Sequence, residues 1–164
     1  MLQIIIKTRR NHALEHASMK VLASNFQGVR MMGHSNPTGF VIIADLPTEI
    51  VTDAVLEARR RLLAGEHDLA IHPGCGTNLA ASSFLSGAAA FLSLKGLSRG
   101  KQPKWWHFLI STFVAVPIYI ISKPVGPLLQ EKYTTDPNIG DLEVTLIRSQ
   151  KLHKGFIHQI CTRA

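Results

Sequence analysis

Cysteine is scarce in this chain, which has only Cys75 and Cys161. Two cysteines this far apart cannot build the disulfide framework of a small secreted domain, and they form no pair at the spacing of a zinc finger. The sequence leaves open a single disulfide between them.

Charged residues are missing from two long segments in the second half of the chain. Residues 69–94 and 105–122 contain no Asp, Glu, Lys or Arg, whereas the loop 95–104 between them holds four cations. Two apolar helical runs joined by a basic turn, with tryptophans at one margin, predict a transmembrane or re-entrant hairpin over residues 77–122. The alternative is a buried helical hairpin in a soluble protein.

Two features of the sequence predict opposite orientations for this hairpin. The positive-inside rule would place the basic loop in the cytoplasm and send both termini across the membrane. The first residues, however, lack the long apolar run and cleavage pattern of a signal peptide. We therefore expect cytoplasmic termini.

The chain is basic overall, but its cations are not arranged for binding nucleic acid. The formal net charge is +7, yet residues 1–70 carry eight Lys or Arg against seven Asp or Glu. No Gly-rich or aromatic-basic RNA-binding pattern is present. Membrane lipid is therefore the expected partner, and nucleic acid is not.

Two histidines and a glutamate near the N-terminus form the motif His-x-x-Glu-His. His12 and His16 are four residues apart, which places them about 40° apart around a helix axis. This is the order of the inverted zinc-protease signature, in which both imidazoles bind zinc and the glutamate, here Glu15, is the general base. The alternative is a partly exposed helix face on which Glu15 pairs with a nearby arginine.

A second candidate group lies at His72-Pro73-Gly74-Cys75-Gly76. The glycines allow a sharp turn that presents Cys75 at the start of the apolar helix, where a thiolate is favoured. Cys75 could then act as a metal ligand or as a nucleophile, and either His72 or Cys75 is a natural third ligand for His12 and His16. Alternatively, the glycines form a tight turn and Cys75 is a small buried side chain.

The remaining pattern predicts an α+β fold in one domain. We expect an α+β part over residues 1–76, the apolar hairpin over 77–122, and a short helix with a β-hairpin over 123–164. The first helix should run from His12 to Ser24 with Asn11 as its N-cap. Further expectations are a loop at His34, a strand over 68–71, and surface positions for His153 and His158.

Several segments together resemble a known family. These are Arg9–Ala17, Gly39–Glu49, Ala64–Glu66, Ile71–Leu79, Pro124–Gln130 and Gly140–Glu143. As a set they resemble the DUF6391 family, uncharacterised membrane proteins of cyanobacteria and Chloroflexi. The resemblance covers most of the chain and implies a membrane protein, but no activity. The zinc-protease likeness is confined to His12, Glu15 and His16, and the downstream glutamate that serves as third ligand in those peptidases has no counterpart here.

Three functional hypotheses follow. The first is a membrane-associated zinc protein, with His12, His16 and His72 or Cys75 as ligands and Glu15 as the base of a peptidase-like hydrolase; with all four ligands bound, the site would be structural. The second is a metal-free enzyme with Cys75 as nucleophile. The third is a non-enzymatic membrane protein that assembles with a larger complex or with copies of itself.

Overall fold

The computed structural model describes residues 2–153 and 155–163. Two compact units make up the chain. The first combines Met1–His72 with Glu131–Ala164, and the second is Pro73–Gln130. The predicted α+β fold class is confirmed, since helices α1 to α5 accompany an antiparallel sheet.

The sheet belongs to the first unit and has the strand order β1-β2-β4-β3. Its strands are β1 (Met31–Asn36), β2 (Gly39–Ala44), β3 (Glu143–Lys151) and β4 (Phe156–Arg163). All neighbouring pairs are antiparallel, and the register places Phe40 opposite Ile160 and Ile42 opposite His158. The predicted pairing of the two C-terminal strands is thus confirmed. Because β4 lies between β2 and β3, strands from the first half of the chain and from its C-terminal part share one sheet.

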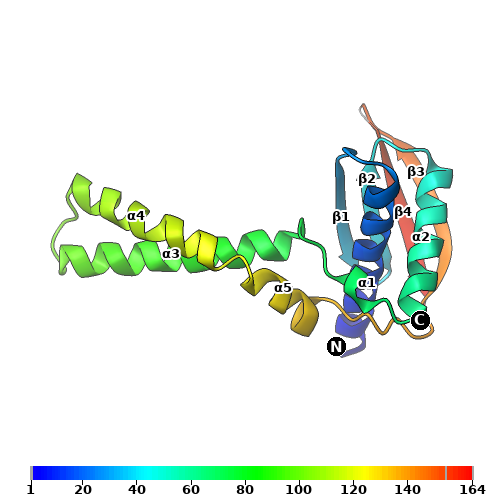
Figure 1. The fold of residues 1–164 in the computed structure, drawn as a ribbon, viewed down its shortest axis with the longest axis horizontal. Coiled ribbons are helices and arrows are strands. Elements are labelled where there is room, and N and C mark those ends of the chain that lie inside the picture. The colour runs from blue at the N-terminus through cyan, green and yellow to red at the C-terminus, as the bar shows by residue number, and fades with distance from the viewer. Residues whose placement is uncertain (1, 154, 164) are drawn as a thin grey trace. The chain divides into compact units, whose positions relative to one another are not determined.

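Helices α1 (Leu2–Asn25) and α2 (Thr48–Leu63) pack against each other and against the sheet (Figure 1). The alternation of β2 turns Phe40 and Ile42 into the core, where they meet Leu14 and Leu22 of α1. Each of these four side chains is at most 1% exposed. Burial of such apolar side chains is the main stabilising contribution to this unit.

The first helix begins ten residues earlier than expected, at Leu2 rather than His12. Asn11 is therefore not an N-cap but a buried residue in the middle of α1. Its side-chain amide donates a hydrogen bond to the Asn36 carbonyl and accepts one from the Thr162 hydroxyl. Asn11 thus joins α1 to two strands, because an amide side chain supplies both a donor and an acceptor.

Three other local expectations were wrong. His34 lies within β1 rather than in a loop, and residues His67–Ala70 form a 3-10 helix, η1, rather than a strand. His158 is completely buried, because β4 is an inner strand whose residues 158 and 160 face the core. His153, by contrast, is exposed as expected.

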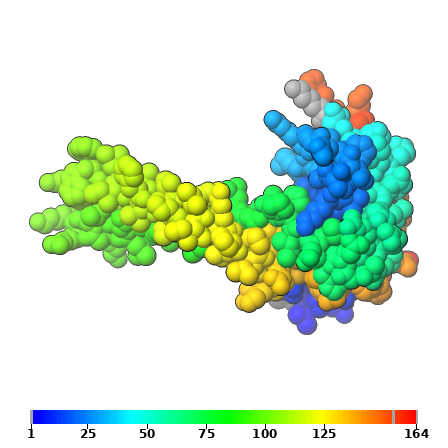
Figure 2. Space-filling model, viewed as in Figure 1, coloured from blue at the N-terminus to red at the C-terminus, as the bar shows by residue number. Residues whose placement is uncertain are grey.

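The second unit is a helical hairpin followed by a short helix. Helices α3 (Gly76–Ser98) and α4 (Trp105–Ile121) lie side by side, and α5 (Val125–Leu129) packs against α3 (Figure 1). The space-filling view shows the side chains of α3 and α4 in contact along the hairpin (Figure 2). A π-helical turn, η2 (Gln130–Thr134), then leads the chain back into the first unit.

Large apolar side chains cover the outside of this hairpin. Phe84, Phe91 and Phe113 are 75%, 65% and 78% exposed. Among the described residues, one helix, Gly76–Ser98, is long and apolar enough to cross a membrane. A second span results if Trp105–Ile121 and Val125–Thr134, which bend by 55° at their break, are counted together.

Candidate metal centre

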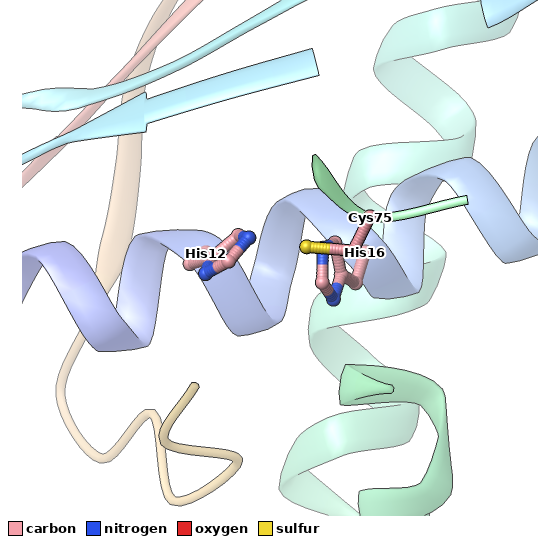
Figure 3. A group of neighbouring side chains, drawn as sticks. All are labelled: His12, His16 and Cys75. Carbon is pink, nitrogen blue, oxygen red and sulfur yellow. The ribbon is translucent and has the colours of Figure 1, made fainter. Parts of the chain in front are cut away.

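The centre is built on the middle of α1, where the helix is buried on nearly all sides. Glu15 and His16 are 4% and 2% exposed, and His12 is half-buried. The rings of His12 and His16 lie on consecutive turns, with centroids 4.2 Å apart and planes inclined by 61° (Figure 3). The helix therefore brings the two imidazoles together, as the four-residue spacing predicts.

His16 is oriented by the short helix η1. Its Nδ1 atom lies 2.7 Å from the Ala70 carbonyl oxygen, and this contact is buried. One turn further along α1, the Lys20 ammonium donates to the Asp68 carbonyl at 2.6 Å and so also holds η1 against the helix. Burial lowers the pKa of Lys20, and the nearby Asp68 carboxylate opposes this shift.

His12 is oriented in the same way by the last residue of η2. Its Nδ1 atom lies 2.9 Å from the Thr134 carbonyl oxygen. The Arg9 guanidinium donates to the carbonyl oxygens of Thr135 and Lys132, and Arg10 forms an ion pair with Asp141 at 3.4 Å. The two arginines before the motif thus fix the segment that orients His12.

These contacts determine the tautomer of both histidines. A carbonyl oxygen can only accept, so Nδ1 of His12 and of His16 must each carry the proton. In a neutral imidazole the lone pair then resides on Nε2. Metal-binding histidines in proteins are held in this manner, with the second ring nitrogen donating to a carbonyl or carboxylate.

His72 and Cys75 are the other two residues that the sequence predicts as ligands. The His72 ring lies 5.7 Å from that of His16, so His72 joins the histidine cluster of the first unit. Cys75 follows three residues later as the N-cap of α3, and the backbone between them can span at most about 11 Å. His12, His16 and Cys75 form a group that could hold a metal ion (Figure 3); His72 is not a member of that group. Within the described residues, neither cysteine forms a disulfide.

Glu15 points toward the sheet. Its carboxylate accepts a hydrogen bond from the Ser35 hydroxyl of β1. It also lies against Gly33, where an added Cβ would be 2.7 Å from the Glu15 Cδ atom. The carboxylate of Glu15 is therefore fixed against β1 by contacts with two of its residues.

No pattern in the sequence pointed to the groups that orient this centre. Ala70 and Thr134 act through backbone carbonyls, which any residue type could provide. Ser35 is an ordinary strand residue until β1 is placed beside α1. Only contacts between distant parts of the chain identify these partners.

The chain was compared with known protein sequences, solved structures and family models. An uncharacterised protein of the cyanobacterium Picosynechococcus sp. is 31% identical over 147 residues, which cover 82% of this chain and 68% of that protein. No solved structure matches the chain significantly. The model of the family described as domain of unknown function DUF6391 matches residues 7–147. The chain therefore belongs to the DUF6391 family.

Proposed function

We propose that this protein is a membrane-associated zinc protein in which His12, His16 and Cys75 hold the ion. The observation that carries this proposal is the pair of contacts from Nδ1 of His12 and His16 to backbone carbonyls. They orient both imidazole rings and leave the lone pair of each neutral ring on Nε2. Imidazole nitrogen and thiolate sulfur are the ligands that zinc prefers.

The ligand number favours catalysis over a structural role. Three protein ligands leave a fourth position for water, as in catalytic zinc sites, whereas four would close the site. Glu15 is adjacent to His16 in the motif, and its buried carboxylate is held by Ser35. We propose that Glu15 accepts a proton from water at the open position, which makes the protein a hydrolase of peptide or other acyl bonds.

Metal analysis of the detergent-purified full chain tests the site. We expect about one zinc per chain by inductively coupled plasma mass spectrometry. The double variant His12→Ala, His16→Ala should lose it, and Cys75→Ala should bind it at least about tenfold more weakly. His67→Ala and Cys161→Ala are matched controls, since His67 is exposed and both lie outside the group. A metal-free wild-type protein, purified without chelator and after zinc has been offered, would contradict the proposal.

The variant Glu15→Gln distinguishes a catalytic zinc site from a structural one. We expect the variant to keep its zinc and to lose at least about 100-fold in the hydrolysis of chromogenic acyl esters and peptides, because the amide cannot accept the proton. Wild-type protein that holds zinc but hydrolyses none of these substrates would support a structural site instead.

A second function is favoured by the position of Cys75 at the start of α3. If the chain binds no metal, Cys75 could serve as a nucleophile with His16 or His72 as its base. Iodoacetamide would then alkylate Cys75 rapidly with or without added zinc. Under the zinc proposal, added zinc protects Cys75 and leaves Cys161 unaffected.

A further inference from the structure

The second unit contains a cavity of about 430 Å³ at the base of the helical hairpin. Its lining includes Cys75, Asn78, Leu79, Ser82, Tyr119 and Lys123. All of these residues lie on α3, on α4 or directly next to them. The volume lies within the range of small-molecule binding sites in proteins, which is about 300 to 1,000 Å³.

The wall of this cavity is held in place by Asn78. Its side-chain amide donates to the Pro73 carbonyl at 2.8 Å, and its Oδ1 atom accepts from the buried Gln130. Gly126 lets α5 approach α3 closely, because an added Cβ there would lie 2.5 Å from the Asn78 Cα atom. The cavity is thus formed by fixed contacts within one unit.

One polar group in the lining has no partner within the described residues. Ser82 is 2% exposed, and its hydroxyl makes no hydrogen bond. Buried hydroxyls in native proteins are nearly always paired, so such a group calls for a ligand or a bound water. Ser86, one turn along α3, is paired in the ordinary way and donates to the Ala115 carbonyl at 2.8 Å.

The rest of the lining combines apolar surface with one charged side chain, which suits an amphiphilic ligand. Leu79, Pro127 and the Tyr119 ring offer apolar surface, and Lys123 is the one charged residue in the lining. The helices that form the cavity carry exposed phenylalanines on their outer faces. We propose that this cavity binds a long-chain fatty acid whose carboxylate pairs with Lys123 and accepts a hydrogen bond from the Ser82 hydroxyl.

This inference names a substrate class for the proposed hydrolase, and to that extent it rests on the proposed function. Cys75 belongs both to the cavity lining and to the metal-binding group. Water would add to the acyl carbon of an ester, the single bond between that carbon and the alkoxy oxygen would break, and an alcohol, a fatty acid carboxylate and a proton would be released. The carboxylate of the released fatty acid would then form an ion pair with the Lys123 ammonium.

Photocrosslinking of the full chain in a neutral detergent tests the inference. The probe is a palmitic acid with a diazirine in its chain, and labelled peptides are mapped by mass spectrometry. We expect labelling concentrated on Leu79, Ser82 and Tyr119, and competition by palmitate at least about fivefold stronger than by hexadecanol, which lacks the charge. Ser82→Leu should reduce labelling at least tenfold because it fills the cavity.

Two smaller substitutions test the inference even if Ser82→Leu prevents folding. Ser82→Ala leaves the cavity open and should reduce labelling about threefold, and Lys123→Gln should reduce it about two- to fivefold. Lys95→Gln, at the far end of α3, is the matched control and should change nothing. Labelling spread evenly over exposed residues such as Phe84 and Phe91, or unchanged in Ser82→Leu, would overturn the inference. Zinc content measured on the same samples separates the two proposals, since loss of labelling with zinc retained leaves the metal site intact.

Discussion

At the scale of single residues, His158 shows how strongly the fold alters a side chain. It is fully buried on the inner strand β4, and neither of its ring nitrogens has a well-formed hydrogen bond within the described residues. Burial lowers the pKa of His158 below its ordinary value of 6.5, and the Leu46 backbone opposes this shift. The native protein therefore holds this imidazole in its neutral form.

This burial predicts sensitivity to acid. Below about pH 6.5 the unfolded chain binds a proton at His158 that the folded chain resists, so the free energy of unfolding should fall as the pH falls. The contribution is fully present above 6.5 and is lost toward the lowered pKa, at no more than about 1.4 kcal/mol per pH unit. In His158→Leu, denaturant unfolding between pH 7 and 5 should show a smaller decline. The exposed His67→Gln should keep the wild-type slope, and an equal slope in His158→Leu would contradict this account.

At the scale of elements, the approach of α5 to α3 depends on one glycine. At Gly126 an added Cβ would collide with the backbone of Asn78, whereas at Gly87, in the interior of α3, nothing lies within 4 Å of an added Cβ. Backbone atoms cannot move aside as easily as the end of a long side chain.

We therefore expect opposite effects from two chemically identical substitutions. Gly126→Ala should lower the free energy of unfolding by about 1–3 kcal/mol. Gly87→Ala should leave it unchanged or raise it by up to about 1 kcal/mol, because alanine favours the helical state. Unfolding in detergent, followed by circular dichroism, provides the measurement. Equal effects of the two changes would show that α5 does not pack closely on α3.

At the element scale, the apolar pattern of the sequence predicts the positions of some helices and not of others. The two segments without charged residues located both hairpin helices within a few residues. The apolar pattern did not find the start of α1, since the run from Leu2 to Ile6 suits a strand as well as a helix. The strand predicted over residues 68–71 does not form, because no neighbouring strand is there to share backbone hydrogen bonds with it. Residues His67–Ala70 form a 3-10 helix instead.

At the scale of the whole molecule, the exposed apolar faces of α3 and α4 underlie the proposed membrane association. Alkaline carbonate extraction of membranes should leave the wild-type chain in the pellet. The double variant Phe84→Lys, Phe113→Lys changes two residues that are 75% and 78% exposed, so little packing is lost. Each lysine costs about 2.5–3.5 kcal/mol near the centre of a bilayer. The variant should shift into the soluble fraction, and wild-type protein found there would contradict the membrane proposal.

The sequence by itself determined the parts of this protein that depend on short separations along the chain. The spacing of His12 and His16, the apolar composition of α3 and α4, and the glycines that bring Cys75 to a helix start are local properties, and local geometry follows from them directly. The tertiary structure decided what depends on distant partners. It supplied the carbonyls of Ala70 and Thr134 that orient the two histidines, the serine that holds Glu15, and the burial of His158. These partners lie 20 or more residues away, and nothing in a side chain's own neighbourhood along the chain specifies which backbone group will meet it after folding.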